Sequence, residues 1–164
     1  MKRIDFASPE SSAPYLIGGF SAVTESSRML SQVARMRLFL PGGKPNRLTL
    51  RVRYDRQQRV TLRLNGHEIG TRDIQADGQP QELCFDAPAE AAKPASILDL
   101  VCEQPHPLDR HVPRCLHVLT LEVAEWDEPA APEPEARDDK VFFGDIHVHS
   151  NLSPCGRPNN GTLA

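Results

Sequence analysis

The chain has 164 residues, of which 39% are hydrophobic and 25% are charged, and its formal net charge is −3. This composition is ordinary for a soluble globular protein, and the weak negative charge argues against nucleic acid as a charge-driven partner. No apolar run approaches the roughly 18 residues of a membrane helix, and the start of the chain lacks the apolar region of a secretory signal. We therefore expect a cytoplasmic protein with reduced thiols at Cys84, Cys102, Cys115 and Cys155.

Short segments of alternating apolar and polar residues predict a β domain over residues 15–126. Residues 1–14 are polar and contain proline and serine, so we expect a loose lead-in there. The alternation predicts strands at 35–40, 48–54, 60–64, 81–85, 97–102 and 116–123, and a turn signal predicts a return strand at 67–74. Asn65-Gly66 lies between two of them and is typical of a type I′ hairpin turn, because both residues accept a positive φ. The best helix candidate, residues 87–92, is short and bounded by prolines. The pattern predicts a mostly-β chain built as an antiparallel β-sandwich or barrel.

The segment that follows the β domain has a different composition. Residues 127–139 contain three prolines and six acidic residues against one arginine, and no large apolar residue. Such a segment buries too little apolar surface to fold on its own. We expect an acidic, Pro-rich linker that separates the β domain from the beginning of a second domain at residues 140–164.

The β domain resembles a known accessory module. The resemblance covers residues 15–126, about 110 in all, and its motifs run from Ala34-Arg35-Met36-Arg37-Leu38 through the hairpin Val60–Gly70 to Leu119-Thr120-Leu121. This run is similar to the jelly-roll modules of the galactose-binding-like folds, which are attached to glycosyltransferases and other bacterial enzymes. The resemblance implies a jelly-roll β-sandwich, and it leaves two roles open: a scaffold, or a module that binds a glycan or a protein.

The sequence Asp145-Ile146-His147-Val148-His149-Ser150 indicates a metal-binding strand. In an extended strand alternate side chains share one face, so Asp145, His147 and His149 point the same way. The two histidine Cβ atoms are then separated by roughly 6.5 Å. Two imidazoles at this spacing can converge on one ion at about 2.0–2.1 Å each. The apolar strand 141–148, the polar loop after it and the cap at Thr162 predict the opening of a β/α unit, cut off as its helix begins.

The segment Gly-Asp-Ile-His-Val-His-Ser-Asn-Leu-Ser-Pro-Cys (144–155) resembles the first motif of the PHP (polymerase and histidinol phosphatase) superfamily. Those enzymes are distorted β/α barrels that hold two or three divalent ions. The resemblance implies that His147 and His149 are metal ligands, and that Asp145 orients them or ligates the ion. It also implies that the complete enzyme uses a divalent metal (Zn, Mn or Fe) to hydrolyse a phosphate ester.

The chain contains no counterpart of the family's later ligands, and two histidines do not enclose a catalytic ion. We therefore expect an N-terminal portion of a PHP-type phosphoesterase, in which no catalytic site is complete and metal binding is weak or absent. The alternative is a non-catalytic β-sandwich module that binds a carbohydrate or a protein.

Overall fold

The computed structural model describes residues 1–24, 26–103 and 115–128. They lie in the first of two compact units, Met1–Ala130. The second unit, Ala131–Ala164, lies outside the described residues and contains the segment 140–164 that was predicted to begin a hydrolase domain. No helix in the described part of the chain is long and apolar enough to cross a membrane.

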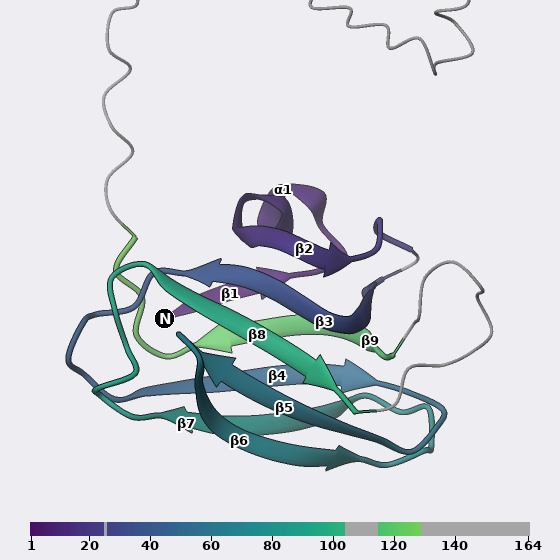
Figure 1. Cartoon of the computed structure of the whole chain (residues 1–164). Helices are drawn as coiled ribbons and strands as arrows, with labels where there is room; N and C mark the ends of the chain where they lie inside the picture. Colours follow the sequence, from purple (N-terminus) through teal and green to yellow (C-terminus); the bar gives the residue numbers. More distant parts are fainter. Residues whose placement is uncertain (25, 104–114, 129–164) are drawn as a thin grey trace, which may run out of the picture. The chain divides into compact units, whose positions relative to one another are not determined.

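The described residues form a mostly-β structure, as the alternation predicted (Figure 1). The two short helices are α1 (Pro9–Ser12) and the 3-10 helix η1 (Ala13–Tyr15). The strands are β1 (Lys2–Asp5), β2 (Leu16–Phe20), β3 (Arg28–Leu38), β4 (Asn46–Arg53), β5 (Gln58–Leu64), β6 (His67–Ile74), β7 (Gln81–Ala87), β8 (Ser96–Cys102) and β9 (His117–Val123).

These strands form an antiparallel β-sandwich of the jelly-roll type, and strand β3 belongs to both of its sheets. The strand order is β6-β5-β8-β3-β9-β4-β7, with β1 paired to β9 and β2 paired to β3. In its second half, β3 pairs with β8, from Val33 opposite Val101 to Leu38 opposite Ser96. In its first half it pairs with β9, where Met29 lies opposite His117. The predicted fold class is therefore confirmed for this part of the chain.

The alternation that predicted the strands also determines which side chains form the core. In β4 and β5 every second residue is buried, so the leucines and valines point inward and the arginines outward. Met36, Leu38 and Leu40, which were predicted to share a face, are all fully buried. The hairpin between β5 and β6 has a positive φ at both Asn65 (51°) and Gly66 (85°), as a type I′ turn requires.

The expectation of a loose lead-in at residues 1–14 is wrong. Residues Lys2–Asp5 form β1, which pairs with the end of β9 so that Ile4 lies opposite Leu121. Ile4 and Phe6 are fully buried, and Ser8 caps α1 by accepting a hydrogen bond from the Ser11 amide at 3.2 Å. The strand escaped prediction because it contains one buried apolar residue among three polar ones.

The helix expected at residues 87–92 is also absent from the structure. The residues after β7 form turns, in which the Ala91 amide donates to the Pro88 carbonyl at 3.1 Å. Ala91 and Ala92 are nevertheless buried, because this turn closes one end of the sandwich. Pro88 and Pro94 leave too few residues between them for a helix to repeat its hydrogen bonds.

Candidate functional site

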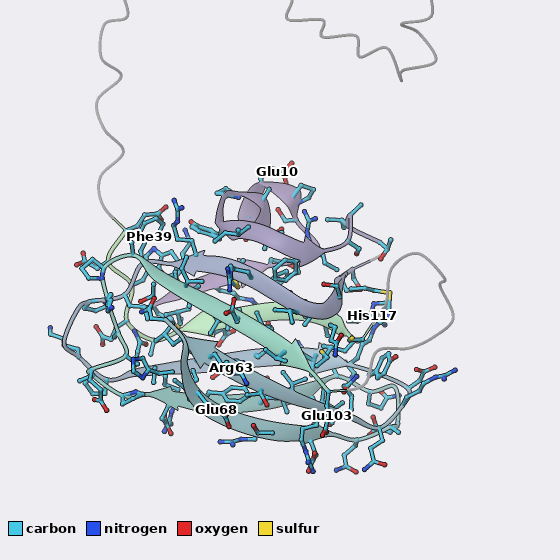
Figure 2. The ribbon with its side chains drawn as sticks, in the orientation of Figure 1. Glu10, Phe39, Arg63, Glu68, Glu103 and His117 are labelled. Carbon is cyan, nitrogen blue, oxygen red and sulfur yellow. The ribbon has the colours of Figure 1, made fainter. Side chains whose placement is uncertain are left out.

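The outer face of the sheet formed by β6, β5, β8 and β3 carries a row of alternating charges. Arg63 lies opposite Glu68 on one side and opposite Asp99 on the other, and Asp99 lies opposite Arg35 (Figure 2). Arg35 and Asp99 form a bidentate pair, with Nε–Oδ1 at 2.6 Å and Nη2–Oδ2 at 3.0 Å. Cross-strand pairs of opposite charge fix the register of a sheet and keep its outer face wet. This row therefore explains how polar side chains are ordered on the face without defining a binding site by itself.

A polar hollow lies on the same face, where β5 begins and β8 ends. Its volume is about 230 Å³. Pockets that bind drug-sized ligands measure roughly 300–1,000 Å³, so this smaller hollow could hold a single small ring. It is lined by amide, guanidinium and carboxylate side chains from three separate parts of the chain: Gln57, Gln58, Arg59, Asp73 and Glu103.

The lining side chains are ordered by contacts with one another. Arg59 on β5 lies opposite Asp73 on β6 and donates from Nε to Asp73 Oδ1 at 2.7 Å. Its Nη1 lies 3.8 Å from Oε2 of Glu103, and the Glu103 amide donates to the Arg59 carbonyl at 3.0 Å. Gln58 is almost fully buried, and its Oε1 accepts from the Arg59 amide at 2.9 Å. The guanidinium is thus held between two carboxylates, and the Arg59 backbone is held by the Gln58 amide.

These contacts stabilise the charged forms of Arg59 and Asp73. The hydrogen bond from Arg59 lowers the pKa of Asp73 below its ordinary value. The same bond, together with the charges of Asp73 and Glu103, raises the pKa of Arg59. A fixed guanidinium between carboxylates offers donors and acceptors side by side, which is the arrangement that binds a ligand with paired hydroxyl groups.

Aromatic side chains contribute to a different part of the domain. Among the described residues no aromatic side chain is fully exposed. Tyr15, Phe39 and Trp126, which we call the aromatic cluster, meet edge to face with ring centroids 5.3–6.5 Å apart. Glu128 accepts from the Tyr15 hydroxyl at 3.2 Å and from the Trp126 indole at 3.1 Å. The aromatic cluster therefore binds Glu128, a residue predicted to lie in the linker, to the β domain.

The predicted metal ligands Asp145, His147 and His149 lie outside the described residues. Within the described residues, no group of three or more histidine, cysteine or acidic side chains is arranged to hold a metal ion. The polar hollow escaped sequence analysis because residues 57–59, 73 and 103 share no local pattern, and only strand pairing brings them together.

No protein-family model and no curated protein matches the sequence. Solved structures do match, and the one titled "Carbohydrate-Binding Module CBM36 in complex with calcium and xylotriose" has a TM-score of 0.52 at 10% identity, over 76% of this chain and 100% of that one. A family 35 carbohydrate binding module from Clostridium thermocellum has a TM-score of 0.49 at 8% identity, over 76% and 99% of the two chains. A family 35 module from an environmental isolate has a TM-score of 0.48 at 19% identity, over 72% and 82%. At these identities the likeness shows the fold alone, a jelly-roll β-sandwich.

Proposed function

We propose that the β domain is a non-catalytic binding module whose ligand is a glycan held in the polar hollow. The observation that carries the proposal is the hollow itself, in which Arg59 is fixed between Asp73 and Glu103. Sugar hydroxyls both donate and accept hydrogen bonds, so adjacent carboxylates and a guanidinium suit a pair of neighbouring hydroxyls. The fold likeness to a module crystallised with xylotriose supports the same class of ligand.

The described residues present no exposed aromatic platform, which bears on the affinity and the kind of glycan that we expect. Aromatic rings add apolar contact area that binds the faces of sugar rings. The hollow instead offers hydrogen bonds at the edge of a ring, many of them in competition with water. We therefore expect modest affinity and a preference for one sugar unit or a chain end over a long polysaccharide surface.

The proposal is tested by screening residues 1–164 on a glycan array and measuring the affinity of positive ligands by titration calorimetry. The variant Arg59→Ala removes the central donor and should abolish the signal. The matched control is Arg47→Ala, because Arg47 forms a similar exposed pair with Asp86 on the other sheet. An array without signal, combined with saturable capture of a protein partner, would favour the protein-binding alternative. Equal binding by both variants would refute the hollow as the binding site.

A second proposal concerns residues 140–164. We propose that they begin a PHP-type metal-dependent phosphoesterase domain in which His147 and His149 bind a divalent ion and Asp145 orients them. The motif Gly-Asp-Ile-His-Val-His is the observation that favours it. The two proposals are compatible, since a binding module and a hydrolase domain can share one polypeptide.

The metal proposal requires a longer protein that contains this sequence. The phosphatase activity of that longer protein in Mn²⁺ or Zn²⁺ should fall at least about a hundredfold in His147→Ala and His149→Ala, because a lost ligand releases the ion that activates water. The control is His67→Ala, since His67 is exposed on the β domain. Full activity in both histidine variants of the motif would end this proposal.

A further inference from the structure

The two sheets of the sandwich separate along one edge of β3. Strand β2 occupies the opposite edge, where Phe20 lies opposite Leu30 and Leu16 opposite Met36. The remaining edge of β3 pairs first with the start of β9 and then with the end of β8. The C-terminal end of β8 and the N-terminal end of β9 therefore meet at the same edge and the same end of the sandwich (Figure 1).

A cysteine occupies each of these two strand ends. Val101 lies opposite Val33, so Cys102 falls at the level of Gln32 in the same register. The Cys115 amide donates to the Leu30 carbonyl at 2.9 Å. Cys115 therefore lies beside Leu30, two positions before Gln32 on the same edge of β3. Residues two apart on a strand are separated by roughly 6.5 Å, which is within the Cα spacing that a disulfide spans.

The side chains of both cysteines point into the core and meet there. Cys102 and Cys115 are both fully buried, and a hydrogen bond joins their thiols. That hydrogen bond, together with burial, raises the pKa of Cys102, whereas the bond that Cys102 donates lowers the pKa of Cys115. The hydrogen bond thus favours ionisation of one thiol of the pair, because the other thiol donates to the thiolate, which is the reactive form. Cys84, in contrast, is exposed and lies on β7.

We propose that Cys102 and Cys115 form an intramolecular disulfide that joins the two sheets when the protein meets a disulfide oxidant such as oxidised glutathione. The thiolate of one cysteine attacks one glutathione sulfur and releases one glutathione thiolate. The thiolate of the other cysteine then attacks the protein sulfur of this mixed disulfide and releases the second glutathione. Two protein thiols and one oxidised glutathione thus become one protein disulfide and two reduced glutathiones, with two electrons transferred.

The disulfide would close a ring over the twelve residues 103–114. A cross-link of this span stabilises chiefly by restricting the unfolded chain, provided the native geometry accepts it without strain. Because both thiols are buried, exchange requires brief opening of the strand ends, so the reaction should be slower than glutathione addition to the exposed Cys84.

The test uses the Cys84→Ser/Cys155→Ser variant of residues 1–164, which retains only the buried pair. The reduced protein is equilibrated with oxidised glutathione under native conditions, then denatured and alkylated, and its intact mass is measured. We expect a monomer that is lighter by two hydrogens than the reduced protein and takes up no alkylating agent. We also expect its thermal midpoint to rise by on the order of 10 °C over that of the reduced form.

Peptide mapping of the unmodified protein provides a second measurement that does not depend on the variant. It should recover one cross-linked peptide pair containing Cys102 and Cys115, with glutathione attached to Cys84. Full alkylation of both buried cysteines would overturn the proposal, provided circular dichroism shows the fold is intact. A lasting glutathione adduct on either one, a disulfide between two chains, or a lowered thermal midpoint would overturn it equally.

Discussion

Two cross-strand arginine–aspartate pairs, one on each sheet, have the same chemistry but different surroundings. Arg47 on β4 holds Asp86 on β7 with Nε–Oδ1 at 2.9 Å, and Arg59 on β5 holds Asp73 on β6 with the same atoms at 2.7 Å. Both pairs are more than half exposed. Of the two arginines only Arg59 also faces Glu103, and its backbone amide donates to the side chain of the buried Gln58.

The difference shows what converts an ion pair into a candidate binding site. An exposed pair contributes little to stability on its own, because water screens it. At Arg59 the chain that leaves β8 adds the carboxylate of Glu103 to a guanidinium that Asp73 already holds. The start of β5, the end of β6 and the end of β8 line the hollow. The site thus arises from where strands end, whereas the strand pairing that orders each arginine is common to both pairs.

The largest expected effect is on the free energy of unfolding, and it tests whether the two sheets that carry these pairs share one cooperative core. Leu62 lies beneath the sheet of Arg59 and Leu50 beneath the sheet of Arg47, and both are fully buried. Replacing either with alanine should lower the free energy of unfolding by about 3 kcal/mol, because each leaves a cavity in the shared core. Urea denaturation followed by circular dichroism should show a single transition for both variants. Two separate transitions would mean that the sheets fold independently.

The second prediction contrasts the two arginines in binding. Arg59→Ala should weaken the affinity for a glycan ligand by about tenfold or more, because it removes charged donors and leaves Asp73 and Glu103 to repel each other. Arg47→Ala should leave the affinity unchanged. Titration calorimetry with the best array ligand measures both. A comparable loss in the two variants would show that overall charge, and not the hollow, governs binding.

A smaller effect is expected from the carboxylate that distinguishes the two pairs. Glu103→Gln keeps the size of the side chain but removes its charge and half of its acceptor capacity. The affinity should fall severalfold, less than for Arg59→Ala, because Asp73 still holds the guanidinium. Asp86→Asn on the other sheet is the control. An unchanged affinity in Glu103→Gln would place the ligand elsewhere on the face.

The smallest effect is on proton binding. Arg59 lowers the pKa of Asp73, so the favourable contribution of this pair is present above the ordinary aspartate pKa of about 4 and is lost as the pH falls through the lowered value. In Arg59→Ala, the Asp73 carboxyl carbon should titrate at a higher pH in an NMR experiment. In Arg47→Ala it should titrate as in the unchanged protein. A titration curve of Asp73 unaffected by Arg59→Ala would disprove the contact.

The sequence predicted the strands that alternate strictly and missed those that do not. β4, β5 and β7 to β9 were found from their period of two, and β6 was found as the return strand after the Asn65-Gly66 turn. The first half of β3 was missed because Ser31 and Gln32 interrupt the alternation where the strand passes from one sheet to the other. β2 was missed because Gly18 and Gly19 carry no side chain to mark a face. Each omission has a local cause, and the fold class followed from the remaining strands.

The candidate site was less accessible to sequence reasoning than the fold. The hollow depends on residues separated by up to 46 positions, from 57 to 103, and no spacing rule connects them. The His-x-His motif is the opposite case, since its chemistry is local and visible in the sequence, while Asp145, His147 and His149 lie beyond the described residues. The metal site thus stays a prediction.

Because β3 supplies hydrogen bonds to both sheets, its amide protons report on the whole domain. The central amides of β3 should be released to exchange with solvent only when the entire domain unfolds, whereas those of the edge strands β6 and β7 should exchange through local fraying. A single strand shared in this way gives the two halves of the sandwich a common melting event. It also means that damage to β3 cannot be confined to one face of the molecule.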